Sequence, residues 1–153
     1  KAVRNMGARV KLTLSGFDKL LAEIQDAGGE IKPATERALQ SSANLATAKI
    51  RSGAEARNLG SEGIIAPTVK WDGNRASVEV GYKLGAYNSR DLSPGFKALF
   101  TEYGTGKRAT KKGANRGAVN ANPFIRPAVE ESKKEIVKAQ KVALERVLKG
   151  LKK

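Results

Sequence analysis

The segment 64–82 predicts a β-hairpin, the most reliable local feature of the sequence. Its turn is the Asp-Gly-Asn sequence at 72–74, whose residues tolerate positive φ. The returning strand has one face made of Ala76, Val78, Val80 and Tyr82. The first strand, residues 64–71, contains Pro67, which indicates an edge strand or a bulge. Trp71 at its end favours hairpin core or cross-strand packing over a ligand platform. A hairpin of this kind predicts an antiparallel sheet.

The N-terminal third predicts one strand followed by two helices. Residues 9–14 alternate polar and apolar side chains, as in a half-buried strand. Residues 17–27 place apolar side chains at helical spacing and end at two glycines. Pro33 suits the first turn of a helix, and an Ala-rich helical face follows it over 33–51, with an extension to 56 left open. The small side chains on this face allow close packing.

The C-terminal half predicts one long helix and leaves one segment open. Apolar side chains at helical spacing predict a helix over 127–151. Residues 96–103 are apolar enough to be ordered, but their pattern does not distinguish strand from helix. No βαβ alternation is present. The element order predicts one α+β domain over residues 1–153, in which a small, mainly antiparallel sheet with a central hairpin packs against the Ala-rich helix and the C-terminal helix.

Composition excludes several classes of catalytic site. The chain has no cysteine and no histidine, so thiolate nucleophiles, zinc hydrolases and His-dependent bases are ruled out. The acidic residues show no paired spacing that suggests a magnesium site. We therefore expect no enzyme activity, no cofactor and no metal. No apolar segment approaches the ~20 residues of a membrane helix, and no signal peptide is apparent. We expect a protein made in the cytoplasm, without a membrane partner.

Lysine and arginine outnumber aspartate and glutamate by 29 to 15, giving a net charge of +14. This excess suggests a polyanionic partner or simply a strongly positive surface. The basic, Gly-rich loop over 104–122, expected to be flexible, concentrates the charge. Its basic residues are Lys107, Arg108, Lys111, Lys112 and Arg116.

The basic loop does not match a nucleotide-binding motif. A Walker A motif aligned on Gly106-Lys107 would need glycine at Thr101 and a hydroxyl at Arg108, and both positions fail. Two interpretations stay open. The loop is either a sequence-independent contact to nucleic-acid phosphates or a solvated tether between ordered elements.

Two motifs flank the loop. Before it stand Glu102, Tyr103, Gly104 and Thr105, and after it stand Pro123, Phe124, Arg126 and Pro127. With the Gly-Phe-Asp-Lys-Leu segment at 16–20 and the Ala-rich helix after it, they resemble the small head–tail joining family of long-tailed bacteriophages and prophages, the neck or tail-completion proteins. The likeness covers most of the chain, and the Pro-Phe-Ile-Arg-Pro-Ala segment is its strongest part.

The resemblance implies a virion structural protein that forms a ring at the head–tail junction. In such a ring the basic residues of the loop contact either DNA or the partner ring. The implied partners are further copies of the chain in a hexamer or dodecamer, the neighbouring head-completion or connector proteins, tail-tube proteins, and genomic double-stranded DNA in the channel. Neck and tail-terminator positions both stay open. The alternative function is a free, sequence-independent nucleic-acid-binding module that uses the basic loop and the C-terminal helix.

The motif residues also have purely structural interpretations. Pro123 and Pro127 fix the start of the last helix, and Phe124 acts as a hydrophobic staple into its first turns. Glu102 is either a buried partner of Arg126 or a surface acid.

Overall fold

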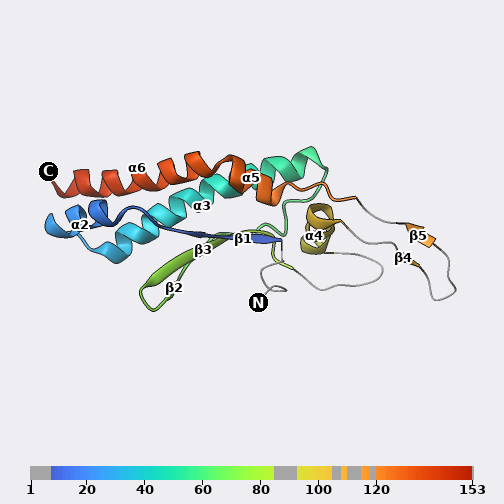
Figure 1. The fold of residues 1–153 in the computed structure, drawn as a ribbon, viewed down its shortest axis with the longest axis horizontal. Coiled ribbons are helices and arrows are strands. Elements are labelled where there is room, and N and C mark those ends of the chain that lie inside the picture. The colour runs from blue at the N-terminus through green and yellow to red at the C-terminus, as the bar shows by residue number, and fades with distance from the viewer. Residues whose placement is uncertain (1–7, 85–92, 105–107, 110–114, 118–119, 153) are drawn as a thin grey trace.

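The computed structural model describes residues 8–84, 93–104, 108–109, 115–117 and 120–152. The elements, in chain order, are β1 (Arg9–Thr13), α2 (Asp18–Asp26), α3 (Ile31–Ala56), β2 (Val69–Asp72), β3 (Arg75–Gly81), α4 (Pro94–Tyr103), β4 (Arg108–Ala109), β5 (Asn115–Gly117), α5 (Ile125–Glu131) and α6 (Lys133–Leu151). Figure 1 shows α3 lying between α6 and a small antiparallel sheet. The predicted α+β class is confirmed.

The sheet has the strand order β1-β3-β2, with both pairings antiparallel. The predicted hairpin is confirmed: Asp72 pairs with Arg75 across a two-residue turn, in which Gly73 has a φ of 61°. A positive φ at the first turn residue is typical of a type II′ hairpin and explains the glycine there. Because β3 is central, its alternate side chains Val78 and Val80 are fully buried.

The first strand of the hairpin is shorter than predicted, because regular pairing covers only Val69–Asp72 instead of 64–71. Ile64 makes an isolated bridge with Tyr82, and the Ile65 N–H donates to the Gly81 carbonyl at 2.8 Å. Pairing then stops before Pro67, which has no N–H to donate to a ladder. The proline therefore separates a single bridge from the strand proper.

The long helix α3 is the central helix of the fold. It begins at Ile31, two residues before Pro33, and reaches Ala56, the longer of the two expected ends. Its buried alanines include Ala38, Ala43 and Ala46, each fully inaccessible to solvent. These small side chains let α6 approach from one side and β3 from the other, so α3 has contacts on two faces.

The C-terminal helix differs from the prediction of one helix over 127–151. It begins at Ile125 and is interrupted at Ser132, which separates α5 from α6. Ser132 has φ −96° and ψ 9°, away from helical values near −63° and −42°, so the regular series of hydrogen bonds breaks there and restarts. The open segment 96–103 belongs to a helix, α4, with Pro94 in its first turn.

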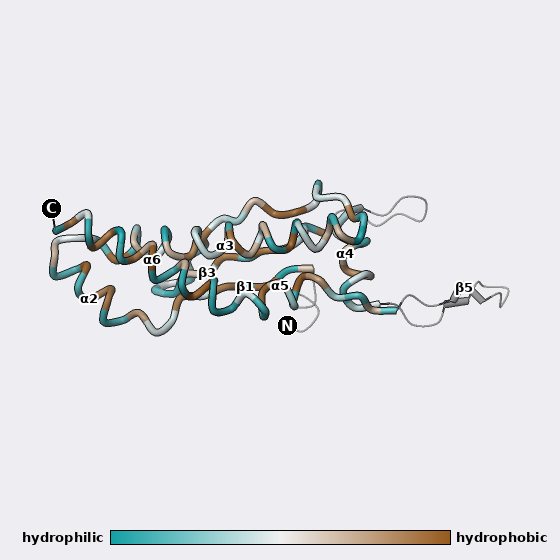
Figure 2. The backbone as a smooth tube through the Cα atoms, turned by 90° about the horizontal axis from the view of Figure 1, so that it is seen from above, coloured by the Kyte–Doolittle hydropathy of each residue, from teal (hydrophilic) through white to brown (hydrophobic). Residues whose placement is uncertain are grey.

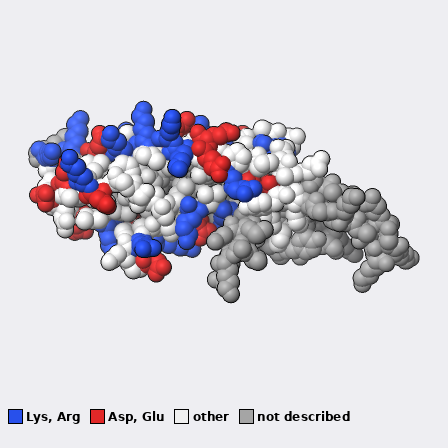
Figure 3. Space-filling view, viewed as in Figure 1, with Lys and Arg blue, Asp and Glu red and all other residues white. Residues whose placement is uncertain are grey.

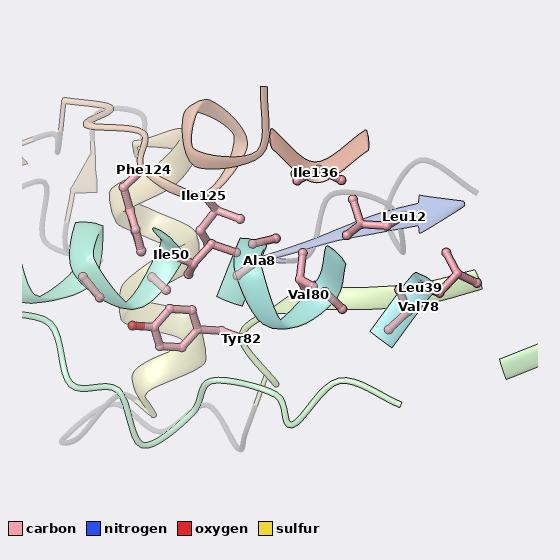
Figure 4. Packing of buried hydrophobic residues seen from close by; sticks show 14 residues of the cluster. Ala8, Leu12, Leu39, Ile50, Val78, Val80, Tyr82, Phe124, Ile125 and Ile136 are labelled. Carbon is pink, nitrogen blue, oxygen red and sulfur yellow. The ribbon is translucent and has the colours of Figure 1, made fainter. Parts of the chain in front are cut away.

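Two hydrophobic clusters of described residues stabilise the fold. The larger joins the sheet, α3, α4, α5 and the start of α6, and contains Leu39, Ile50, Tyr82, Phe124 and Ile125 (Figure 4). The smaller joins α2, α3 and α6. Figures 1 and 2 place α2 and the C-terminal end of α6 at one end of the molecule and α4 at the other.

Candidate functional site

The two motif segments that flank the basic loop meet at the carboxylate of Glu102. One of its oxygens accepts the N–H groups of Phe124 and Ile125, both at 2.8 Å. The other accepts the Arg126 N–H at 3.1 Å. These three N–H groups stand at the start of α5 and have no partner within that helix. Glu102, at the end of α4, therefore caps α5 from a distant part of the chain, and its side chain is 1% exposed.

Arg126 completes the pairing of this buried carboxylate. Its Nε lies 3.2 Å from Glu102 Oε2, and its guanidinium lies 4.6 Å from the centroid of the Tyr103 ring. The Arg126 side chain is 53% exposed, so it covers the carboxylate from the solvent side. Of the two interpretations of Glu102, the buried partner of Arg126 is confirmed and the surface acid is wrong.

Arg57, just after α3, holds the segment before α5. Its guanidinium donates to the carbonyl and the side-chain oxygen of Asn122 and to the Pro123 carbonyl, at 3.1–3.3 Å. The guanidinium also donates a hydrogen bond to the Gly53 carbonyl of α3 at 3.1 Å, and it lies 5.5 Å from the centroid of the Phe124 ring. The sequence did not single out Arg57, because its partners lie 65 residues away in the chain.

Phe124 packs across the molecule, so its role extends beyond a local staple at the start of α5. It is 3% exposed, and its ring meets Tyr82 edge-on at 6.1 Å between centroids. A Cβ on Gly53 would lie 3.2 Å from Phe124 Cβ, so glycine in α3 makes room for this approach. Figure 4 shows Phe124 and Ile125 directed into the cluster around Ile50.

The two ends of the loop leave the body side by side. The Asn122 N–H donates to the Thr101 carbonyl of α4 at 2.7 Å. Gly104 ends α4 with a φ of 73°, a value that favours glycine, and its N–H donates to Phe100. We use the term loop root for the cluster of Glu102, Tyr103, Gly104, Arg57 and the segment 122–126. Pro127 lies beside it, in the first turn of α5.

The predicted contact residues of the loop fall largely outside the described part. Lys107, Lys111 and Lys112 are outside the described residues, as is the motif residue Thr105. Arg108 and Arg116 belong to β4 and β5, which pair antiparallel through Arg108 and Gly117. This short ladder was not predicted from the sequence. The loop as a phosphate or partner contact stays a prediction, as does its flexibility.

An open groove of about 620 Å³ runs beside the loop root, between α3 and the start of α5 and α6. Lys49, Arg57, Glu131 and Glu135 contribute charges of both signs to its lining. Among the described residues there is no cluster of His, Cys, Asp or Glu able to hold a metal ion. The absence of enzyme activity and of a cofactor stays a prediction.

A second polar feature lies in the interior. The Gln140 side chain of α6 is 3% exposed and donates to the Thr13 carbonyl and to Ser42 Oγ, both at 3.2 Å. Ser42 in turn donates to the Leu39 carbonyl at 2.9 Å. These bonds join β1, α3 and α6. No pattern in the sequence indicates these bonds, since Gln140 occupies a position where helical spacing predicts an apolar residue.

Tyr82 is the buried titratable group of the larger cluster. Burial raises its pKa above the ordinary value of 10.0, and the positive charge of Arg51 opposes this in part. Its hydroxyl donates to the Gly60 carbonyl at 2.8 Å. The buried phenol therefore acts as a structural hydrogen-bond donor. Trp71 packs on α3, as its Nε1 donates to Glu36 at 2.8 Å and Lys32 lies over its ring.

Comparison with protein-family models, with curated proteins and with solved structures gives no significant match to this chain. None of the helices in the described residues is long and apolar enough to cross a membrane.

Proposed function

We propose that this protein is a structural component of a bacteriophage virion that forms a ring at the head–tail junction, as a neck or tail-completion protein. The observation that carries the proposal is the loop root, where the two segments of the family-like motif are brought together. Glu102 and Gly104 from the first segment contact or adjoin Phe124 and Arg126 from the second. The resemblance in sequence thus coincides with one site in space.

The loop root also supports an assembly role. It ties both ends of a basic segment to one end of the molecule, the end formed by α4, through hydrogen bonds of 2.7–3.3 Å. A segment anchored in this way begins and ends at fixed points of the body, and we propose that it contacts a neighbouring ring or DNA. In the proposed ring, copies of the chain form a hexamer or dodecamer between head-completion or connector proteins and tail-tube proteins. Genomic double-stranded DNA passes through the channel.

The first test is the mass and shape of the purified protein. Light scattering and electron microscopy are applied to the protein alone and to its mixture with a purified tail tube or portal-side ring. We expect a closed ring with a central hole in at least one sample, as rotational closure of a subunit interface requires. A strict monomer that ignores both partners, yet binds duplex DNA with a steep salt dependence, would replace the proposal with a free nucleic-acid-binding module.

The role of the basic loop is tested by replacing Lys107, Arg108, Lys111 and Lys112 with Ser. We expect this variant to keep the wild-type melting temperature within a few degrees, because the loop root supplies the anchoring contacts, and to bind DNA more weakly. Cooperative unfolding at a much lower temperature would instead mean that these side chains stabilise the fold.

A further inference from the structure

The outward face of α6 carries a row of lysines that no established contact explains. Spacings of three, four and eight residues place the members of this row on one side of the helix. They are Lys134, Lys138, Lys141, Lys149 and Lys152, and all five are exposed. We use the term α6 lysine row for them. Figure 3 shows Lys and Arg side chains along the side of the molecule formed by α6, with Asp and Glu side chains among them.

Little of this charge is compensated within the described residues. Among the acids there, only Glu145 pairs with the row, with an oxygen 3.9 Å from Lys141 Nζ. Glu135, on the same helix, instead pairs with Lys49 of α3 at 3.5 Å. Like charges three or four residues apart destabilise a helix, and Lys134–Lys138 and Lys138–Lys141 are such pairs. Lys149 and Lys152 stand at the C-terminal end of α6, where positive charge complements the helix dipole. Helix stability therefore accounts for the C-terminal members of the row but not for Lys134 and Lys138, whose charge is available to an external anion.

The structure of α6 argues against a lipid surface. A membrane-surface helix needs a free apolar face to insert among the lipid headgroups. Most of the apolar face of α6 is occupied, since Ile136, Leu144 and Leu148 are buried in contacts with α3 and α2. The exposed apolar side chains of α6 are Val137, Val142 and Leu151. Their spacing places Val142 on a different side of the helix from the other two, so they form no continuous free apolar face. Figure 2 shows hydrophilic and hydrophobic residues alternating along the helix, as an amphipathic helix packed on one side requires.

The α6 lysine row also lacks the features of a binding site for single-stranded nucleic acid. Binding to unpaired bases uses aromatic side chains as stacking platforms, and residues 125–153 contain no Phe, Tyr or Trp. The row spans about 27 Å from Lys134 to Lys152 at the helical rise of 1.5 Å per residue. One strand of B-DNA carries a phosphate for about each 3.4 Å of axis, so a straight row of this length lies within reach of several phosphates.

We propose that the α6 lysine row binds the phosphate backbone of double-stranded DNA. This inference rests on the proposed function, because it assigns the DNA-facing surface of the ring subunit to α6. It is separate from the basic loop, whose root is formed by α3, α4 and the start of α5. Contacts to phosphates alone carry no sequence information, so the binding is independent of sequence and decreases steeply with salt.

The test uses a variant in which Lys134, Lys138, Lys149 and Lys152 are replaced with Gln, a residue of similar helix propensity. Lys141 is retained because it pairs with Glu145. The matched control replaces four exposed lysines on other elements with Gln: Lys11, Lys19, Lys70 and Lys97. Both variants lose the same charge. Fluorescence anisotropy with a mixed-sequence duplex of about 30 base pairs gives the affinity of each between about 50 and 200 mM NaCl.

For the row variant we expect the slope of log affinity against log salt to fall in magnitude by about 3.6, because each phosphate contact contributes about 0.9. At about 100 mM salt this corresponds to a loss of affinity of about 10³-fold. The control variant is expected to change the slope by less than about 0.9, the contribution of one phosphate contact. Circular dichroism melts of both variants verify that the helices are retained.

Three outcomes overturn the inference. The first is a wild-type protein that does not bind duplex DNA at about 50 mM salt. The second is an equal loss in the row and control variants, which would assign the binding to overall charge. The third is a loss confined to the loop variant with Ser at 107, 108, 111 and 112.

The oligomeric state of the same variants separates this inference from the proposed function. If the row variant forms rings normally and binds DNA like the wild type, the assignment of DNA binding to α6 is overturned and the head–tail role stays in place. A protein that forms no ring with either partner, but binds DNA through the row, would overturn the head–tail role and retain the DNA-binding surface.

Discussion

Replacing Glu102 with Ala removes the acceptor on which the loop root depends. The carboxylate is 1% exposed and accepts the buried N–H groups of Phe124 and Ile125 at 2.8 Å. A buried donor left without a partner costs about 1–3 kcal/mol. Two such donors give about 4 kcal/mol, a large part of the ~5–15 kcal/mol that stabilises a typical domain. For a chain of this size we expect the melting temperature to fall by about 10 °C.

The effect of Arg126→Met should be much smaller than that of Glu102→Ala. The Arg126 side chain is 53% exposed, so water screens its charge, although its partner Glu102 is only 1% exposed. Glu102 keeps its three backbone donors in this variant. The asymmetry between the two partners is the specific signature of a carboxylate that caps a helix, because a simple ion pair loses the same contact when either residue is removed.

Urea denaturation followed by circular dichroism gives the free energy of unfolding of each variant, with Glu62→Gln at an exposed position as the control. Amide hydrogen exchange provides a local readout: in Glu102→Ala the protection of the Phe124 and Ile125 amides should be lost before that of the sheet. An unfolding free energy within about 0.5 kcal/mol of wild type would refute the capping role, since that is the range of ordinary surface substitutions.

Three further predictions concern α3, α6 and the core. Gly150→Ala should stabilise α6 by about 0.5 kcal/mol, because a Cβ at position 150 meets no atom within 4 Å. Gly53→Ala should stabilise the protein less, because a Cβ at position 53 would lie 3.2 Å from Phe124. Equal gains in the free energy of unfolding, measured by urea denaturation, would contradict that contact. Tyr82→Phe should lower stability by about 1 kcal/mol near neutral pH. Because the pKa of Tyr82 is raised in the folded state, the stability that its hydroxyl contributes is full below pH 10.0 and declines above it. The difference in unfolding free energy between wild type and Tyr82→Phe should therefore shrink at alkaline pH. A difference that stays constant with pH would contradict this. Gln140→Leu keeps the volume but loses two hydrogen bonds of 3.2 Å, and should cost about 1 kcal/mol; a variant as stable as wild type would show that these bonds contribute nothing.

Local patterns in the sequence were sufficient to predict most elements. The hairpin follows from alternation around a turn, and α3 follows from its Ala-rich face after Pro33. The helix predicted at 17–27 is α2, Asp18–Asp26, and the strand predicted at 9–14 is β1, Arg9–Thr13. In each case the signal lies within the segment itself, because side-chain periodicity and turn residues act over a few positions.

The features that were not predicted depend on contacts distant in sequence. The interruption at Ser132 carries no proline or glycine to mark it, so an uninterrupted helical pattern was the natural prediction. Gln140 is polar at a buried position because its partners come from β1 and α3. For Glu102, the sequence left a buried and a surface position open, since burial depends on α4 packing beside the start of α5.

The same long-range contacts explain how a basic loop can be carried on this fold without weakening it. Closing a loop becomes more costly only slowly with length, by about 0.6 kcal/mol for each doubling. The hydrogen bonds that the Phe124 and Ile125 N–H groups donate to Glu102 stabilise the fold by several times this cost, according to the estimate above. Arg57 adds a second attachment from α3, at Asn122. The loop root therefore fixes where the loop leaves the body, so the charge and length of the loop are free to match a partner while the two hydrophobic clusters stay unchanged.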